Sequence, residues 1–189
     1  MSGLKYGTLE LIIGPMYAGK STELIRIINR YRSLGKSILV INHIFNNRYN
    51  SNNLTTHNKE EIENCIIVSK LEEIEINHKN IFDSVDVIVI EELQFFEDAY
   101  NFVTKWCDIN GKNLICAGLD GDFERKPFGD VLRLIPHSEK IIKLTALCVR
   151  CGDGTPAIFS KRIISNTNKM LVGGSEEYAA CCRKHYIEN

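Results

Sequence analysis

The segment that most constrains the fold of this chain is a glycine-rich motif of the form GxxxxGK[ST] at residues 14–22. It follows the apolar run 9–13 and precedes 23–28, where apolar side chains recur at helical spacing. A strand, a turn and a helix in this order direct successive backbone N–H groups and a helix N-terminus at one concavity. The motif therefore predicts a phosphate-binding loop rather than a chance glycine turn. The predicted loop consists of Gly14, Pro15, Met16, Tyr17, Ala18, Gly19, Lys20, Ser21 and Thr22.

Two side chains of this loop suit a bound nucleoside triphosphate. The Lys20 ammonium would lie against the outer phosphates as a mobile point charge. The Ser21 hydroxyl would occupy one coordination position of a magnesium ion shared with those phosphates. The loop therefore predicts ATP and Mg²⁺ as cofactors.

Strand-like and helix-like runs alternate along the chain, which predicts an α/β fold with a parallel sheet flanked by helices. Expected strands are 9–13, 37–42, 65–68, 85–90, 112–118 and 140–144, and expected helices are 20–34, a short piece near Leu71, 96–109 and 129–134. Gly35 and Gly111 suit left-handed helix caps, and the polar segment 46–58 reads as a loop. A length of 189 residues with 44 % hydrophobic residues allows one large core and a small appendage. We expect a nucleotide-binding domain at 1–146 and a smaller domain at 147–189.

An apolar run at 85–90 ends in two carboxylates, Glu91 and Glu92. A buried parallel strand of this kind delivers its last side chains to the sheet edge where ligands bind. One carboxylate could reach the metal while the other accepts a proton from an attacking hydroxyl. Because consecutive strand residues face opposite ways, only one of them need point into the site. The alternative is a solvated acidic strand end.

Two pairs of metal-ligand residues near the C-terminus each have a two-residue spacer: Cys148 with Cys151, and Cys182 with His185. Three sulfurs and one imidazole suit tetrahedral Zn²⁺, and a closed four-ligand site is structural because it leaves no position for substrate. The glycine-containing turns between the pairs suggest a lasso-like loop. Cys181 is the competing ligand at the third position, and unpaired reduced thiols are the alternative to a metal site.

Composition restricts partners and location. A formal charge of −1 offers no basic field for long nucleic acid, and no stretch reaches the roughly 20 apolar residues that a membrane span requires. The N-terminus lacks the apolar segment of a signal peptide, and an odd count of seven cysteines favours a reducing compartment. Cys65, Cys107 and Cys116 lie in or beside apolar runs and are expected in the core. We expect a soluble, cytoplasmic protein that binds neither nucleic acid nor membrane.

Five segments together resemble the type II thymidine kinases, whose members include human cytosolic, poxviral and bacterial enzymes. They are GPMYAGKSTELIR at 14–26, ELQFF at 92–96, GLDGDF at 118–123, RKPFG at 125–129 and KLTALC at 143–148. The resemblance runs from about residue 7 to residue 186, and several of these segments are peculiar to that family. It implies a RecA-like phosphate-loop domain with a zinc-binding lasso, and Mg²⁺-dependent transfer of the γ-phosphoryl group of ATP to the 5′-hydroxyl of thymidine.

The resemblance also assigns roles to individual residues. Glu92 matches the general base, Lys20 the loop lysine, Ser21 the magnesium-linked hydroxyl, and Arg48 an arginine beside the transferred phosphate, with Glu91 on the metal side. Residues matching the nucleoside pocket and lasso are Met16, Gln94, Phe95, Leu119, Phe123, Phe128, Leu171, Val172, Gly173 and Tyr178. The family further implies a homotetramer, feedback inhibition by thymidine triphosphate, and deoxyuridine as a second substrate.

Three positions depart from the family pattern. Asn46 and Glu91 stand where an aspartate is usual, and Leu93 replaces a glycine or valine. Two other classes of function stay open at this point, and the second of them draws on Asn46 and Leu93. One is a phosphate-loop ATPase that acts on nucleic acid through the zinc module, and the other is a regulatory nucleotide-binding protein without catalysis.

Overall fold

The computed structural model describes residues 6–46, 54–55, 61–62, 65–165 and 173–188. Its centre is a six-stranded sheet in the order β5-β2-β6-β7-β1-β8, and every neighbouring pair is parallel. The strands of this sheet are β1 (Thr8–Ile13), β2 (Ile38–His43), β5 (Cys65–Val68), β6 (Val87–Ile90), β7 (Asn113–Gly118) and β8 (Lys140–Lys143). The predicted parallel α/β fold and its six strands are confirmed.

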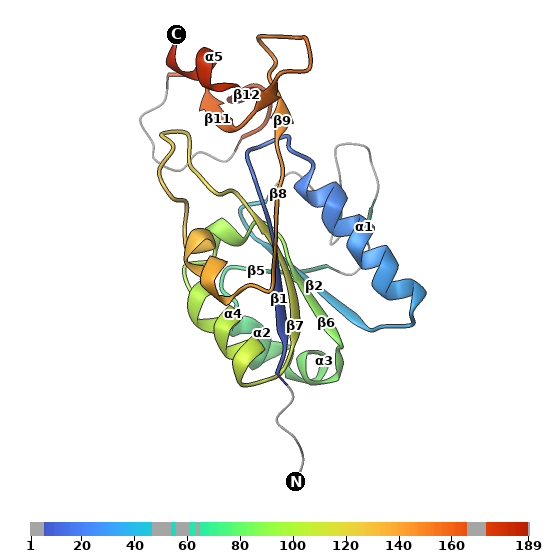
Figure 1. The fold of residues 1–189 in the computed structure, drawn as a ribbon. Helices are drawn as coiled ribbons and strands as arrows, with labels where there is room; N and C mark the ends of the chain where they lie inside the picture. The colour runs from blue at the N-terminus through green and yellow to red at the C-terminus, as the bar shows by residue number, and fades with distance from the viewer. Residues whose placement is uncertain (1–5, 47–53, 56–60, 63–64, 166–172, 189) are drawn as a thin grey trace.

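Helices cover both faces of the sheet (Figure 1). They are α1 (Lys20–Ser33), α2 (Glu72–Asn77), α3 (Lys79–Ser84) and α4 (Ala99–Asp108), with the 3₁₀ segments η1 (Leu93–Phe95) and η2 (Val131–His137). Helix α1 packs on one face, where it buries Leu24, Ile25, Ile27 and Ile28. The other elements cover the opposite face, around a core that includes the fully buried Trp106. Because alternate strand residues face opposite layers, strands such as β6 are buried on both sides.

Glycine caps end two of the helices as expected. Gly35 has φ 68°, its N–H donates to the Arg32 carbonyl, and the next N–H, of Lys36, donates to Tyr31. This pair of bonds is a Schellman motif, which satisfies carbonyls at the end of α1. Gly111, with φ 64°, follows α4 in the same conformation.

Two expected elements differ from the structure. The segment 129–134 was expected to be an α-helix, but Gly129 has φ 56° and lies outside any helix, and the following η2 is a 3₁₀ segment that contains Pro136. Proline lacks the N–H that an α-helix would use there. The segment 46–58, expected as a loop, contains β3 (Leu54–Thr55), which pairs with β4 (Glu61–Ile62).

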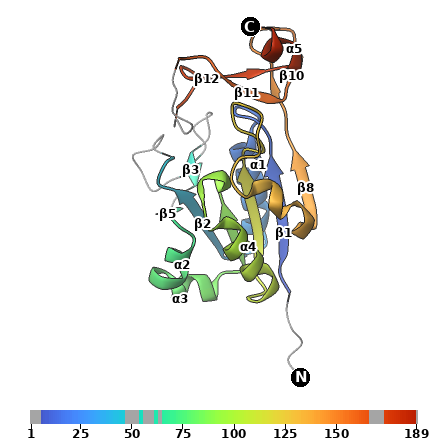
Figure 2. The same ribbon diagram turned by 90° about the vertical axis from the view of Figure 1, so that its left-hand side faces the viewer.

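The C-terminal part forms two small antiparallel sheets and a short helix beyond the carboxyl ends of β1 and β8, at the opposite end from the N-terminus (Figure 2). Its elements are β9 (Ala146–Leu147), β10 (Pro156–Ala157), β11 (Phe159–Arg162), β12 (Tyr178–Cys181) and α5 (Arg183–Ile187). Strand β9 pairs with β10, and β11 pairs with β12. This part packs on the glycine-rich loop, because Tyr17 and Ala18 contact its core.

Cys65, Cys107 and Cys116 are buried in the core clusters that flank the six-stranded sheet, as expected. Burial raises the pKa of Cys65 and of Cys107 to about 12, so both stay protonated at neutral pH. All seven cysteines, which lie within the described ranges, are free thiols. No helix in those ranges is both long and apolar enough to cross a bilayer.

Candidate active site

The glycine-rich loop joins the end of β1 to the start of α1, at the carboxyl edge of the sheet. Gly14 has φ 151°, and a Cβ there would lie 2.5 Å from the Leu144 carbonyl oxygen, so only glycine fits. Gly19 adopts a left-handed conformation directly before α1. The first two helical residues are Lys20 and Ser21, which places both at the positive end of a 14-residue helix.

Both helical side chains already have polar contacts. The Lys20 ammonium donates to the Pro15 carbonyl at 2.8 Å, which folds the side chain back over the loop. The Ser21 hydroxyl donates to the Glu91 carboxylate, although Glu91 follows β6 and β7 lies between β6 and β1. A hydroxyl and a carboxylate in contact at the N-terminus of a helix are oxygen ligands of the kind that Mg²⁺ prefers. These residues therefore fit a magnesium ion.

Glu91 and Glu92 follow β6 and face different surroundings, because the chain leaves the strand conformation at Glu92. Glu91 is 5 % exposed, whereas Glu92 is half-buried and has φ 53° and ψ 40°. A left-handed conformation is uncommon for a residue with a side chain, and such strain clusters at functional sites. The turn aims the Glu92 carboxylate at Gln94, whose Nε2 donates to it at 2.5 Å. The Gln94 side chain is buried, and its Oε1 accepts from the Leu119 N–H at 3.0 Å. Gln94 thus fixes the orientation of Glu92.

Five of the ten residues expected in the nucleoside pocket and lasso form one apolar cluster. Met16, Leu119 and Tyr178 are its buried members, and Phe123 and Phe128 pack against them. These residues come from the glycine-rich loop, from the segment after β7 and from β12, so the fold brings together positions up to 162 residues apart, as from Met16 to Tyr178. Phe95 contacts Phe128 at the edge of this cluster, and the centroids of the two rings lie 5.7 Å apart.

Other expected residues are placed less directly. Gly173 lies against the Glu177 side chain, whose carboxylate accepts from the next N–H, of Gly174, at 2.6 Å. Arg48, Leu171 and Val172 lie outside the described residues. Of the departures from the family pattern, Leu93 is fully buried in the main core.

Asn46 is the third departure, and it lies just beyond β2. Its Nδ2 donates to the Asn42 side chain at 3.3 Å, and its backbone N–H donates to the His43 carbonyl at 2.9 Å. A carboxamide can donate this side-chain bond, whereas a carboxylate could not.

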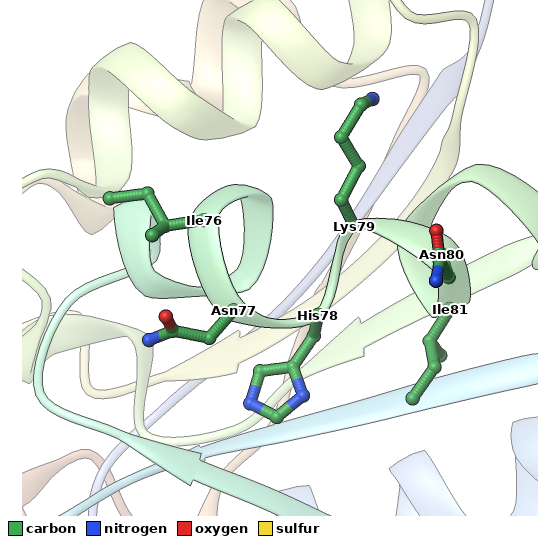
Figure 3. A pocket seen from close by; sticks show the side chains of 6 residues that line it. All are labelled: Ile76, Asn77, His78, Lys79, Asn80 and Ile81. Carbon is green, nitrogen blue, oxygen red and sulfur yellow. The ribbon is translucent and has the colours of Figure 1, made fainter.

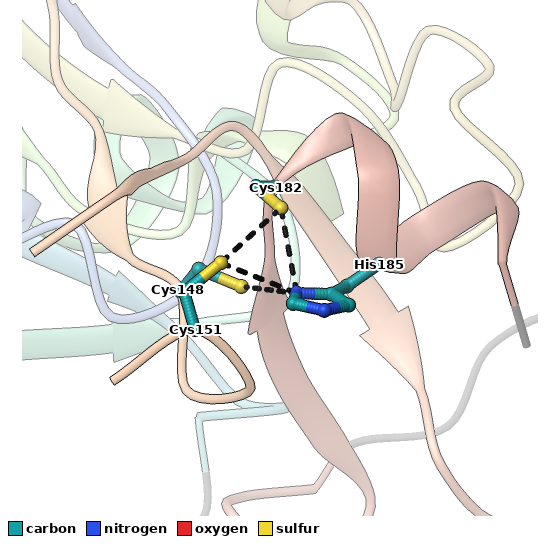
Figure 4. A group of neighbouring side chains, drawn as sticks. All are labelled: Cys148, Cys151, Cys182 and His185. Carbon is teal, nitrogen blue, oxygen red and sulfur yellow. Dashed lines mark hydrogen bonds between the residues drawn. The ribbon is translucent and has the colours of Figure 1, made fainter. Parts of the chain in front are cut away.

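The four residues expected to bind zinc converge at the C-terminal end (Figure 4). Their ligand atoms all lie within 4.8 Å of one another, with the Cys151 and Cys182 sulfurs 3.8 Å apart and His185 Nδ1 3.3 Å from Cys151. Two sulfurs at about 2.3 Å from a tetrahedral zinc would lie about 3.8 Å apart, so the set fits the ion. Cys181, the competing ligand, instead places its sulfur 3.9 Å from the His185 carbonyl.

A surface hollow elsewhere contains none of the expected site residues (Figure 3). It lies at the junction of α2 and α3 and is lined by Ile76, Asn77, His78, Lys79, Asn80 and Ile81. His78 and Lys79 point in opposite directions, so its polar groups do not converge on one ligand position.

Sequence reasoning missed two residues that connect the C-terminal part to the site. Ser160 on β11 is 5 % exposed, and its Oγ accepts from the Met16 N–H of the glycine-rich loop at 2.9 Å. Tyr186 on α5 donates its hydroxyl to the Phe123 carbonyl at 2.6 Å. Neither lies in a recognisable motif. Their importance depends on strand register and helix position, which local patterns do not specify.

A parallel sheet with helices on both faces, a glycine-rich loop between β1 and α1 and a carboxylate after β6 defines the class of parallel α/β proteins, with the strand–loop–helix context that the GxxxxGK[ST] motif requires. A family model described as "Thymidine kinase" matches residues 7–186. The chain is 43 % identical over 185 residues to the thymidine kinase of Yaba monkey tumor virus, covering 96 % of each chain. It is 41 % identical to that of Sheeppox virus, covering 97 % of this chain and 99 % of the relative, and 42 % identical to that of Vaccinia virus, covering 97 % and 98 %. The chain belongs to the thymidine kinase family.

Proposed function

We propose that the protein transfers the γ-phosphoryl group of ATP to the 5′-hydroxyl of thymidine, giving thymidine monophosphate. Family membership supports this reaction, and the observation that carries it is the arrangement at the sheet edge: the Ser21–Glu91 contact beside a second carboxylate, Glu92, in a strained turn. Deoxyuridine is a second proposed substrate on the same family grounds.

The chain's own residues suit the steps of this transfer. Backbone N–H groups of 14–22 and the α1 N-terminus would hold the phosphates, and Lys20 would exchange the Pro15 carbonyl for their oxygens. Ser21 and Glu91 would hold Mg²⁺, which offsets phosphate charge when bound. Glu92, oriented by Gln94, would accept the proton of the 5′-hydroxyl as the nucleoside oxygen attacks the γ-phosphorus and the bond from that phosphorus to the bridging oxygen breaks, which releases ADP. Arg48 is proposed to offset charge on the transferred group.

The nucleoside base is proposed to bind against the apolar cluster of Met16, Leu119, Phe123, Phe128 and Tyr178. Aromatic rings at these positions suit stacking on a pyrimidine. Residues 171–173 are proposed to close over it, and Zn²⁺ on the Cys148–Cys151–Cys182–His185 set is proposed to anchor the ends of that segment.

Three properties of the family are carried over as further proposals: a homotetramer, inhibition by thymidine triphosphate, and a cytoplasmic location. Seven free cysteines are consistent with a reducing compartment. Thymidine triphosphate added to the kinase assay tests the second proposal, and sedimentation of the purified protein with thymidine tests the first.

A nucleic-acid-directed ATPase is the less favoured function. The near-neutral charge supplies few phosphate contacts, and the Cys/His module uses its inner surface to pack against the glycine-rich loop.

The proposed reaction is tested by phosphoryl transfer from ATP to thymidine, deoxyuridine, deoxycytidine and deoxyadenosine, with Glu92→Gln beside the wild type. We expect thymidine to be phosphorylated and the variant to lose about 100- to 10,000-fold in kcat, because the amide cannot accept the proton. Glutamine matches glutamate in size, so the variant should fold. ATP turnover without a nucleoside product in the wild type would refute the proposal.

A further inference from the structure

The two phenylalanines 123 and 128 lie on a tight turn outside the six-stranded sheet, which we name the aromatic hairpin (residues 121–128). Gly121 and Pro127 form its single bridge, and the Asp122 N–H donates to the Lys126 carbonyl at 2.9 Å. The Asp122 carboxylate accepts from the N–H groups of Glu124 and Lys126 at 2.8 and 2.9 Å. These bonds fix the internal shape of the hairpin. They do not fix where it lies relative to the glycine-rich loop, so its placement depends on what it packs against.

The C-terminal part holds the hairpin through several contacts, three of which involve Tyr186 or the Phe123 ring. Tyr186 donates its hydroxyl to the Phe123 carbonyl at 2.6 Å. The Arg125 guanidinium lies 4.6 Å from the centre of the Tyr186 ring, and the Arg162 guanidinium lies 3.7 Å from that of Phe123. Arg125 has φ 67°, an uncommon conformation for a residue with a side chain. The left-handed conformation of Arg125 directs its side chain onto the Tyr186 ring, so the shape of the hairpin matches the position of Tyr186.

Tyr186 is itself firmly placed. Its ring packs on Phe159 of β11 with centroids 4.9 Å apart, and its backbone N–H donates to the Cys182 carbonyl at 2.9 Å. It directly follows His185, so the helix that carries this fitted metal ligand, and that begins just after Cys182, also carries this hydroxyl. Because both the ring and the backbone of Tyr186 are fixed, its hydroxyl can hold the Phe123 carbonyl in a defined position.

We propose that Tyr186 is a positioning residue: by holding the Phe123 carbonyl, it keeps the aromatic hairpin against the nucleoside side of the site. The inference rests on the proposed function, because Phe123 is a proposed contact of the thymine base. Tyr186 lies on the nucleoside side and makes no contact with Lys20, Ser21 or Glu91 among the bonds described. Its loss should therefore weaken thymidine binding and leave ATP binding and the chemical step nearly unchanged.

The test is Tyr186→Phe, which removes one hydroxyl and keeps the ring that contacts Phe159 and Arg125. We expect the KM for thymidine to rise about three- to tenfold, the value of one hydrogen bond, while the KM for ATP and kcat change less than about twofold. Amide hydrogen exchange at 121–126 should become faster. Tyr100→Phe is the matched control, because it also removes one phenolic hydrogen bond, to His137, but on α4.

A second variant, Arg125→Met, removes the guanidinium above the Tyr186 ring and should shift the thymidine KM in the same direction. An unchanged thymidine KM in Tyr186→Phe, or equal rises in the KM of both substrates, would overturn the positioning role. A wild-type protein that does not phosphorylate thymidine would instead refute the proposed function, so the two failures are distinct.

Discussion

At the scale of single residues, the site depends on backbone conformations that only certain side chains tolerate. Glu92 adopts a left-handed backbone conformation, and the hydrogen bond from the buried Gln94 amide to its carboxylate offsets the strain energy of that conformation. Gln94 is held in turn by the Leu119 N–H and lies against Gly118 and Gly129. The proposed base is therefore oriented by a chain of close contacts that leaves no room for an added methyl group.

Gly129 provides a test of that chain. It has φ 56°, and an added Cβ would lie 2.5 Å from the Gln94 carbonyl oxygen, whereas Gly35, with φ 68°, has no atom within 4 Å of its Cβ position. Alanine at either position costs about 1–2 kcal/mol in backbone strain. We expect Gly129→Ala to lose about 1–3 kcal/mol more than Gly35→Ala in the free energy of unfolding, because of the clash, and to lower kcat. Urea unfolding and the kinase assay measure both; equal losses would show that the contact relaxes freely.

At the scale of elements, apolar runs were sufficient to predict all six strands of the main sheet, and glycine caps marked the ends of two helices. Their signals are local: each strand is a short buried run, and Gly35 ends α1 with the expected cap. The 3₁₀ form of η2 was missed because Pro136 and Gly129 act on hydrogen bonding rather than on apolar spacing. Helix α3 was not among the expected elements; only His78 separates it from α2, so one short expected helix stands where the structure has two.

The features of the candidate site also fall into two groups: those that local sequence motifs predict and those that only the folded structure brings together. The loop, the acidic pair and the four candidate metal ligands lie in motifs, so the sequence alone predicts them. Ser160, Tyr186 and the orienting contact of Gln94 arise from tertiary packing between segments far apart in the chain. Residue spacing along the sequence carries no record of such contacts.

The C-terminal elements allow a test of ligand identity at two adjacent cysteines. Cys182 lies in the four-residue cluster, whereas Cys181 is buried on β12 outside it. We expect Cys182→Ala to lose bound zinc and Cys181→Ala to retain it, since a structural site needs all four ligands. Metal content by mass spectrometry tests this.

Hydrogen exchange would measure how far the effect of losing the metal extends through the chain. In Cys182→Ala, amides of β11 and β12 should exchange faster while those of β6 and β7 keep their protection, because the four candidate ligands all lie in the C-terminal part. Zinc retained by Cys182→Ala and lost from Cys181→Ala would reverse the ligand assignment.

At the scale of the whole molecule, the sheet order brings chemistry from distant segments to one edge. The segments that follow β1 and β6 meet at the carboxyl edge of the sheet, although β7 separates the two strands. The C-terminal part packs on the same edge (Figure 1). His43 at the end of β2 also belongs to this region. Its Nδ1 accepts from the Phe45 N–H and its Nε2 binds the Ser69 carbonyl, both at 3.1 Å, so the ring carries its proton on Nε2 and is neutral. The ring packs edge-on against Phe96.

This neutral histidine links the stability of the whole chain to pH. Burial lowers the pKa of His43 below its usual 6.5, more than the Ser69 carbonyl and the charges of Asp98, Glu92 and Glu73 raise it. Above about pH 6.5 neither the folded nor the unfolded state is protonated at His43, and the folded state keeps its full stability. As the pH falls below this value, the unfolded chain binds the proton first, so the free energy of unfolding decreases by up to about 1.4 kcal/mol per pH unit. We expect His43→Gln to be less stable than the wild type at pH 7.5 but to lose less stability between pH 7 and 5, as measured by urea unfolding at each pH. Parallel stability curves for the two proteins would show that His43 takes up its proton equally in both states, which would contradict the neutral, buried ring.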